Sequence, residues 1–354
     1  MYDSVANDVT TALETAQPTQ FTTALVSDIL ALASGGANGT DVTINTIRPN
    51  TNGVTTVSGS MGAEVVFFEQ TTNTANIQLN NANLPTVIFQ GRGGVNVTVN
   101  DNVTTPGADQ TKVDRVIVGS AGNDKIVVQD AKNTKIVLGG GDSSVTAGGG
   151  VDTVVAGLGN STITGGTGDY TVVKLGGAAS NYTVTTAQNN SHAVIRDVTT
   201  GKVTDVTKVQ YVQLDNGNAL IFAKSSVEAQ VANLYHTAFG RTADAGGLDY
   251  WFDIARAGGS LKQISTSFVN STEFTSLHSN ETQTEFVQSL YHNTFNRVGE
   301  DAGVAFWLAE LAGGKTKADL VLSFAELAIQ NIQHTAGNQE AEVVGSINII
   351  GNII

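Results

Sequence analysis

The sequence predicts a multi-domain β + α protein: a parallel β-solenoid with an N-terminal helical segment and a C-terminal all-α domain of two repeats. Three observations lead to this fold class. The middle of the chain alternates Val, Ile, Thr and Asn in short runs separated by Gly and Asn, which is typical of short strands and turns. Part of this region repeats every nine residues. A later region with helical spacing repeats every 56 residues.

Composition excludes several classes of protein. Lys and Arg number 18 against 32 Asp and Glu, so the net charge of −14 disfavours a nucleic-acid partner. The 40% of hydrophobic residues supply a core, which argues against disorder. With no cysteine, the chain has no disulfides, thiolate metal sites or Cys nucleophiles. Apolar runs stay far below about 20 residues, so we expect no membrane-spanning segment.

Residues 1–36 are expected to be an N-terminal helical segment, because apolar residues recur at helical spacing from residue 4 onward. Pro18 should divide it into two helices, the second near residues 20–34 and ended by Gly35 and Gly36. The apolar face of this second helix needs a partner. Either the next domain or another subunit would cover it. The face comprises Phe21, Leu25, Ile29 and Leu32.

Residues 37–223 are expected to form the solenoid, with regular nine-residue repeats over 119–173. Two such units would make one coil of about 18 residues, and successive coils would rise by about 4.8 Å. The eighth position of every unit is β-branched and should point inward. These residues are Ile126, Ile136, Val145, Val154, Ile163 and Val172. Residues 180–223 should cap the solenoid, with a tight turn at Asp215–Gly217.

Two units, Gly119–Val127 and Ala147–Val155, resemble the RTX, or haemolysin-type calcium-binding, nonapeptide. The resemblance implies a parallel β-roll in which turn carbonyls and the Asp at the sixth position bind Ca²⁺ between stacked turns. Calcium is a hard cation that takes oxygen ligands, and glycine lets carbonyls converge on it.

The chain departs from that pattern, because only Asp124 and Asp152 keep the carboxylate at the sixth position. Stacking would place Asp124 against Ser143 and Asp152 against Tyr170. In each case another carboxylate stands one place early, so the resemblance gives a set of four candidate calcium ligands. They are Asp124, Asp142, Asp152 and Asp169. The alternative is a metal-free roll whose turns close by hydrogen bonds through Ser, Thr and Asn.

Residues 224–335 should be an α-helical domain of two repeats, in which aromatic residues recur 56 positions apart and pack into each repeat's core. The repeated pairs are Tyr235 and Tyr291, Trp251 and Trp307, and Phe268 and Phe324. The pattern resembles a helical domain of unknown function found in type I-secreted and surface-layer proteins, which implies self-association or anchoring.

Each helical repeat also carries an arginine after its first helix. Arg241 is expected to pair with Asp244, and Arg297 with Glu300 or Asp301, because a carboxylate satisfies the guanidinium fork. The alternative is that the two arginines bind a carboxylate or a glycan.

Residues 336–354 form a C-terminal tail or strand, uncharged after Glu342. It would be an uncleaved secretion signal, a strand that pairs with a sheet edge of the next subunit, or a frayed end. The expected acceptors are the region Val42–Ile47 and the first coil of the solenoid.

No catalytic motif stands out, so we expect a protein that is not an enzyme. The sequence favours a secreted extracellular structural protein that self-assembles into a surface layer or filament, with Ca²⁺ as its expected cofactor. Lacking a cleaved N-terminal signal, it would leave the cell by type I secretion. The alternative function is a calcium-binding adhesin or glycan-binding matrix protein. The expected partners are further copies of itself and cell-surface polysaccharide.

Overall fold

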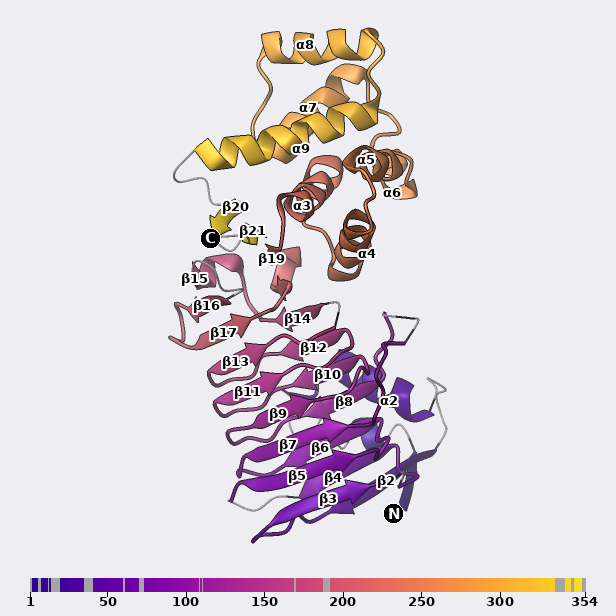
Figure 1. Ribbon diagram of the computed structural model, residues 1–354, viewed down its shortest axis with the longest axis vertical. Coiled ribbons are helices and arrows are strands. Elements are labelled where there is room, and N and C mark those ends of the chain that lie inside the picture. Colours follow the sequence, from indigo (N-terminus) through magenta and orange to yellow (C-terminus); the bar gives the residue numbers. More distant parts are fainter. Residues whose placement is uncertain are drawn as a thin grey trace. The chain divides into compact units, whose positions relative to one another are not determined.

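The computed structural model describes residues 2–5, 8–11, 13, 20–34, 41–59, 61–69, 73–107, 109, 111–168, 170–186, 192–334, 341–344 and 347–351. The chain divides into two compact units (Figure 1). The solenoid unit comprises residues 1–176, 181–185 and 191–212, and the helical unit comprises 177–180, 186–190 and 213–354.

The solenoid unit is built from two sheets whose strands alternate along the chain. Sheet A has the order β1-β2-β4-β6-β8-β10-β12-β14-β18, and sheet B the order β15-β16-β17-β13-β11-β9-β7-β5-β3. The strands of sheet A are β1 (Tyr2–Val5), β2 (Asp41–Ile47), β4 (Val65–Glu69), β6 (Thr86–Gln90), β8 (Arg115–Val118), β10 (Thr134–Val137), β12 (Asp152–Val155), β14 (Thr171–Lys174) and β18 (Tyr211–Gln213). Those of sheet B are β3 (Val54–Ser58), β5 (Ala75–Asn80), β7 (Val95–Asn100), β9 (Lys125–Val128), β11 (Ser143–Thr146), β13 (Ser161–Thr164), β15 (Tyr182–Thr186), β16 (His192–Asp197) and β17 (Val203–Thr207).

Successive coils pair in parallel from β2 to β14 in sheet A and from β3 to β13 in sheet B, which confirms the predicted parallel β-solenoid. Equivalent side chains therefore stack in rows. Ile126, Val145 and Ile163 stand in one row, and Ile136 and Val154 in another. All five are at most 2% exposed, as predicted for inward positions.

The prediction for the sixth inward residue, Val172, is wrong by one position. Val173 is in register with Val154, while Val172 aligns with Thr153 in the adjacent row. The offset between paired residues is 18 for Ile136 and Val154 but 19 for Val154 and Val173. The turn before β14 therefore contains one extra residue, which moves the inward position along by one.

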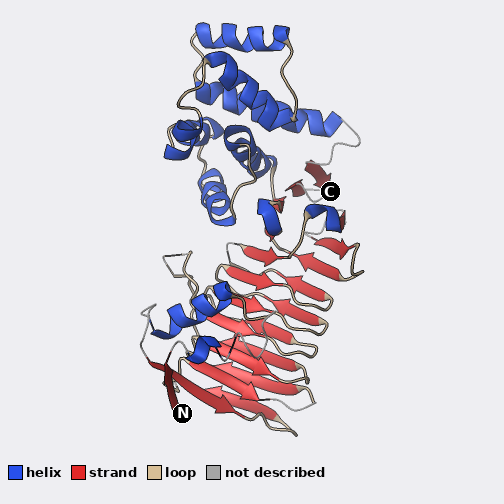
Figure 2. Ribbon diagram, turned by 180° about the vertical axis from the view of Figure 1, so that it is seen from behind, coloured by secondary structure: helices blue, strands red, loops and turns tan. Residues whose placement is uncertain are grey.

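The N-terminal segment covers the outer face of sheet A (Figure 2). Phe21, Leu25 and Ile29 are buried around helix α2 (Thr23–Ser34), and Leu32 is partly buried in the same cluster. They pack on outward side chains of the sheet, among them Val65, Ile88, Val116 and Val118. Of the two partners considered for this face, the neighbouring domain is therefore the one that covers it.

The start of the chain differs from the helical prediction. Residues 2–5 form β1, which pairs antiparallel with β2. Helical backbone is found at residues 8–11 and 13. Pro18, Gly35 and Gly36, which were predicted to divide and end these helices, lie outside the described residues. An extended segment gains ladder hydrogen bonds with the edge of β2, and this tertiary gain outweighs local helix propensity.

The far end of sheet B closes by a change of strand direction. β17 adds parallel to β13, and β16 then pairs antiparallel with β17. This hairpin belongs to the predicted cap. The expected tight turn at Asp215–Gly217 is a short 3₁₀ turn, followed by β19 (Ala219–Ala223), which groups with the helical unit.

The helical unit consists of α3 (Ser226–Phe239), α4 (Ala245–Arg256), α5 (Leu261–Val269), α6 (Thr272–Leu277), α7 (Gln283–Phe295), α8 (Asp301–Ala312), α9 (Lys317–His334), β20 (Ala341–Val344) and β21 (Ile347–Gly351). β21 pairs antiparallel with β19 of the same chain. One expected acceptor for the tail, Val42–Ile47, is already paired within the chain, with β1 up to Ile44 and with β4 from Ile44 onward.

The two helical repeats have matching aromatic cores, as predicted. In the first, the ring of Phe268 lies 4.7 Å from that of Tyr235 and 5.2 Å from that of Trp251. In the second, Phe324 lies 5.0 Å from Tyr291 and 4.9 Å from Trp307. Among the helices described, none is both long and apolar enough to cross a membrane.

Candidate functional site

The three predicted calcium ligands that the structure describes lie in different environments. Asp124 immediately precedes β9 and is 3% exposed, while Asp152 begins β12 and is fully buried. Asp142 is exposed in the turn before β11. Asp169 lies outside the described residues. Of the described candidates, two carboxylates are therefore buried and one lies at the surface.

Both carboxylate oxygens of Asp124 accept hydrogen bonds from the protein. Oδ1 accepts from the backbone N–H of Val95 at 3.1 Å and from the hydroxyl of Ser120 at 2.6 Å. Oδ2 accepts from the backbone N–H of Ser120 at 2.8 Å. The side chain thus ties its own turn to the strand of the preceding coil.

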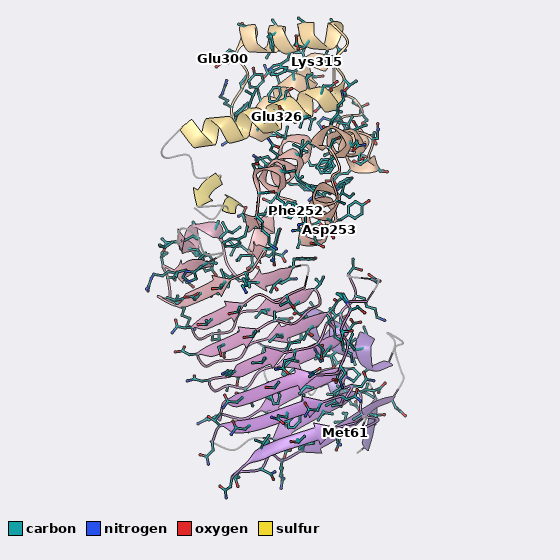
Figure 3. All side chains as sticks on the ribbon, viewed as in Figure 1. Met61, Phe252, Asp253, Glu300, Lys315 and Glu326 are labelled. Carbon is teal, nitrogen blue, oxygen red and sulfur yellow. The ribbon has the colours of Figure 1, made fainter. Side chains whose placement is uncertain are left out.

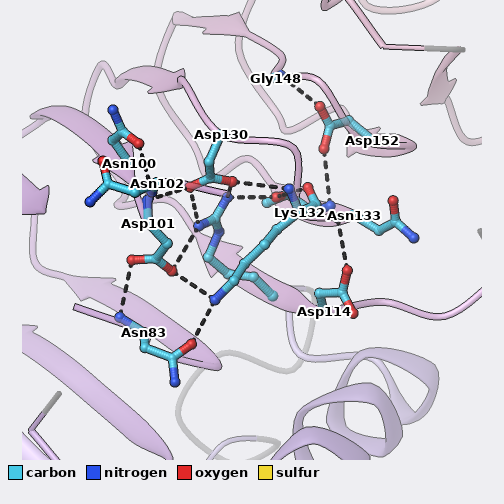
Figure 4. Close-up of polar contacts among 12 residues, drawn as sticks. Asn83, Asn100, Asp101, Asn102, Asp114, Asp130, Lys132, Asn133, Gly148 and Asp152 are labelled. Carbon is cyan, nitrogen blue, oxygen red and sulfur yellow. Dashed lines mark hydrogen bonds and ion pairs between the residues drawn. The ribbon is translucent and has the colours of Figure 1, made fainter. Parts of the chain in front are cut away.

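Asp152 repeats this arrangement in the other row of turns. Its Oδ2 accepts from the backbone N–H of Gly148, four residues earlier, at 2.6 Å. Its Oδ1 accepts from the backbone N–H of Thr134, in the preceding coil, at 2.9 Å (Figure 4). Asp124 and Asp152 therefore both cap a turn and bridge two coils through backbone donors.

Of the two predicted stacking pairs, one is correct and one is wrong. Asp124 donates its backbone N–H to the hydroxyl of Ser143 at 3.3 Å, so these residues do face each other. Asp152 is in register with Thr171, not with Tyr170, because of the extra residue in the turn before β14. The backbone N–H of Thr171 instead donates to Oε1 of Gln210 at 2.7 Å.

The three carboxylates that the structure describes do not fit a calcium ion. Calcium requires six to eight oxygen ligands, usually with several carboxylates. Asp142 is engaged elsewhere, since its Oδ1 accepts from the backbone and side-chain N–H groups of Asn160 at 2.8 and 3.1 Å. In the part of the chain that the structure describes, no three His, Cys, Asp or Glu side chains gather closely enough to hold a metal.

The turns themselves close by direct backbone stacking. A Cβ on Gly139 would overlap the carbonyl oxygen of Ser120, and a Cβ on Gly166 would overlap that of Gly148. Only glycine permits this approach between neighbouring coils. A Cβ on Gly148, in the unit Ala147–Val155 that resembles a calcium motif, would likewise lie 2.3 Å from the carbonyl oxygen of Asp130, so this glycine has a packing role.

Burial dominates the electrostatics of the two inward aspartates. It raises the pKa of Asp124 to about 6, against the opposing effect of the hydrogen bonds from Ser120 and Val95. Burial likewise raises the pKa of Asp152 to about 6, against the bonds from Gly148 and Thr134. Each carboxylate is therefore costly to ionise although it accepts several hydrogen bonds.

A second charged cluster, which the sequence analysis missed, lies beside Asp152 inside the solenoid (Figure 4). Its centre is Arg115, the first residue of β8, whose side chain is 1% exposed. Arg115 donates to both oxygens of Asp130, at 2.8 and 2.9 Å, and to the hydroxyl of Thr134 at 2.9 Å. Asp101 and Lys132 complete the cluster.

A signal for this cluster was present in the sequence. Arg115 stands two residues before Ile117, which is in register with the inward Ile136. Because strand side chains alternate with a period of two, Arg115 must point inward as well. A buried arginine requires buried acidic partners, and the structure identifies them as Asp101 and Asp130.

The arginines of the helical repeats form internal ion pairs, as expected, but the main partner of Arg241 was missed. Arg241 makes a two-point contact with Glu273, Nε to Oε1 at 2.8 Å and Nη2 to Oε2 at 3.0 Å, while Asp244 is 3.6 Å away. Asp244 mainly caps α4 through the N–H of Gly247. Arg297 pairs with Glu300, labelled in Figure 3, at 2.8 Å.

Comparison with known proteins gives a partial match. A family model described as "Domain of unknown function (DUF4214)" matches residues 222–277 and 265–328. The first range spans α3 to α6, and the second reaches into α9, so the match follows the two helical repeats. No curated protein and no solved structure matches the chain. The chain is therefore similar to the DUF4214 family in its helical repeats.

Proposed function

We propose that this chain is a secreted, extracellular structural protein that assembles with copies of itself into a surface layer or filament, and that it has no enzymatic role. Export by type I secretion belongs to the same proposal. Calcium dependence is not part of the proposal, because the carboxylate oxygens of the inward aspartates accept hydrogen bonds from backbone N–H groups.

One observation carries this proposal: sheet B ends in an open strand. β3 pairs with β5 on one side, and among the described residues no strand pairs with its other side. The matching end of sheet A is covered over Asp41–Ile44, where β1 pairs with β2. The open side of β3 presents backbone donors and acceptors that a strand from another molecule can use.

The composition of β3 suits such pairing. Proteins usually protect an open edge with charged residues or proline, and Val54–Ser58 contains neither. Val54 is 49% exposed. Thr55 and Val57 align with Ile77 and Leu79 of β5, so an added strand would continue the rows of the solenoid. In a protein with a net charge of −14, an uncharged edge is also where two copies can approach with little repulsion.

The proposal is tested by light scattering and negative-stain microscopy of purified protein. Wild type should form regular polymers, and Thr56→Lys should reduce assembly because it places a charge on the exposed edge. Thr162→Lys is the matched control, since Thr162 is an exposed residue of sheet B in the interior strand β13. Monodisperse wild type under all conditions, or equal assembly of both variants, would refute the role of β3.

The C-terminal strand provides a competing contact. Because β21 pairs with β19 of the same chain, exchange of β21 between chains would also link subunits. Deletion of residues 345–354 tests this route. If refolded truncated protein stays monomeric while Thr56→Lys assembles normally, the tail and not β3 joins the subunits. If only export from cells fails, the tail is a secretion signal.

A second candidate function, binding of a cell-surface polysaccharide, is favoured by the outer face of sheet B. Asn76, Asn96 and Lys125 stand in one outward row, and Asn96 donates to Asn76 at 2.9 Å. A groove of about 510 Å³ lies over this row. A glycan array tests it: Asn96→Ala should lower binding, whereas Gln129→Ala, an exposed amide in a turn, should not.

A further inference from the structure

Charged side chains from consecutive coils meet inside the solenoid unit. Asp101 follows β7, Arg115 begins β8, and Asp130 follows β9. The side chains of Arg115, Asp130 and Asp101 are 1%, 0% and 4% exposed. Buried charges are unfavourable unless they are paired and hydrogen-bonded, so each of these groups needs a partner of opposite charge within the fold.

Arg115 supplies the positive charge for both carboxylates. Its Nη1 and Nη2 contact Oδ2 and Oδ1 of Asp130 at 2.9 and 2.8 Å, and Nη1 also lies 3.4 Å from Oδ2 of Asp101. The two carboxylates belong to turns 29 residues apart, which are further joined by the backbone N–H of Asp101 donating to Asp130 at 2.8 Å. One guanidinium therefore bridges two coils.

Lys132 extends the bridge to a third coil. Its Nζ donates to Oδ2 of Asp101 at 2.8 Å and to Oδ1 of Asn83 at 2.7 Å. The backbone N–H of Asn83 in turn donates to Oδ1 of Asp101 at 3.0 Å. The turns after β5, β7 and β9 are thus held together around two aspartates and two basic side chains, with a net charge of zero (Figure 4).

We propose that Arg115 and Lys132 are built-in counter-cations that take the place of a bound divalent ion between these turns, so that the solenoid folds and stays folded without calcium. A divalent cation between Asp101 and Asp130 would leave the same net charge as Arg115 and Lys132 now do. The turn at Asp130 stacks directly on the turn of the unit Ala147–Val155, which resembles a calcium-binding repeat, since Gly149 N–H donates to the carbonyl of Asp130 at 2.8 Å. In the turns joined by Arg115 and Lys132, the bridging charge comes from the chain's own side chains.

Two further observations support this role. Burial raises the pKa of Asp130, but the hydrogen bonds and charge of Arg115 outweigh it, so the pKa lies below the usual range and the carboxylate is ionised beside the guanidinium. In both rows of turns, the carboxylate oxygens of Asp124 and Asp152 accept hydrogen bonds from backbone N–H groups. The contacts of Arg115 and Lys132 lie within one chain and do not depend on assembly of copies.

The first test is thermal unfolding of the full chain, followed by circular dichroism in EGTA and in millimolar Ca²⁺, with Mg²⁺ as a control for ionic strength. The expected result is the same melting temperature in all three. A melting temperature that falls in EGTA and is restored by Ca²⁺ but not by Mg²⁺ would overturn the proposal.

The second test separates charge from packing at Arg115. Arg115→Met should lower the melting temperature markedly, and Arg115→Lys, which keeps the charge, should recover part of the loss. Arg115→Met combined with Asp130→Asn should lose much less than the sum of the single changes, because the unpaired carboxylate is removed. Additive losses, or equal losses for Met and Lys, would show that the side chain only fills space.

If Arg115→Met does not fold, Lys132 gives the same test at a less buried position, since its side chain is 16% exposed. Lys132→Met should lower the melting temperature in the wild-type background but have little effect in an Asp101→Asn background. An equal loss in both backgrounds would contradict the assignment of Lys132 as a counter-cation.

Discussion

The hydroxyl oxygen of Tyr235 occupies the position toward which a side chain on Gly247 would extend, since a Cβ there would lie 2.5 Å from it. The second helical repeat has the same relationship between Gly303 and the hydroxyl of Tyr291. The tyrosine of the first helix therefore leaves room only for glycine near the start of the second helix in both repeats. This contact explains why that glycine recurs 56 residues later.

Gly247→Ala should destabilise the helical unit. Alanine favours a helix by about 1 kcal/mol over glycine, but the clash with Tyr235 should cost about 1–3 kcal/mol and more than offset that gain. Urea unfolding followed by circular dichroism measures the change. Adding Tyr235→Phe, which removes the hydroxyl, should recover part of the loss.

Gly246→Ala is the matched control for this substitution. Gly246 is exposed on the same helix, and the equivalent position in the second repeat is Ala302. This variant should be as stable as wild type or slightly more so. Equal destabilisation by both alanine variants would show that backbone effects at the start of α4, and not the Tyr235 contact, govern the result.

The inward row of sheet B gives a second prediction. Ile163 is fully buried and stands in register with Val145 and Val206. Ile163→Asp should unfold the solenoid unit, because an isolated buried carboxylate costs at least several kcal/mol. Thr162→Asp, at the exposed neighbouring position, should leave the melting curve almost unchanged. A folded Ile163→Asp variant with wild-type stability would contradict the inward assignment.

The fold was predictable because two periodicities are strong in the sequence. The nine-residue repeat fixes which residue of each coil points inward, and five of the six predicted inward residues are confirmed. The sixth failed at Val172 because a single extra residue in a turn is invisible to a repeat count but shifts the strand register. The strand β1 was missed because its partner, β2, is remote in sequence.

The candidate site was less predictable, because the type of a buried polar residue does not show which groups form hydrogen bonds with it. Asp124 and Asp152 match a calcium motif by position, yet their oxygens are taken by N–H groups of preceding coils. Whether such a carboxylate binds calcium or accepts hydrogen bonds from N–H groups depends on the backbone geometry of the turns. Arg115 had a detectable signal in its inward register, whereas Glu273 as the partner of Arg241 had none, since 32 residues separate them.

The two helical repeats provide an internal comparison of ion pairs, which gives a third prediction. Arg241 and Arg297 both lie over a tyrosine and a phenylalanine ring, but only Arg241 has Glu273, whose equivalent position is Ile329. Arg241→Met should cost up to about 1 kcal/mol, because the pair is half exposed. Arg297→Met should cost less. Glu273→Gln should reproduce most of the Arg241→Met effect.

The last prediction concerns pH. Burial raises the pKa of Asp124 and Asp152 to about 6, whereas an aspartate in the unfolded chain titrates near pH 4. Between these values the folded protein binds more protons, so the free energy of unfolding should fall as the pH rises from about 4 to about 6. A shift of about two pKa units corresponds to roughly 3 kcal/mol for each group. The lowered pKa of Asp130 acts in the opposite sense, since its contribution is lost as the pH falls below about 4.

Urea unfolding at pH 4.5 and 7 measures this dependence, and Asp152→Asn isolates the contribution of one carboxylate. Asparagine keeps an oxygen that accepts a hydrogen bond but cannot ionise, so the variant should lose less stability between the two pH values than wild type does. Asp142→Asn, the same substitution at an exposed aspartate, is the control for the change of residue type. If Asp152→Asn leaves the slope as in wild type or makes it steeper, then ionisation of Asp152 does not weaken the fold. Its hydrogen bonds from Gly148 and Thr134 would then compensate fully for its burial.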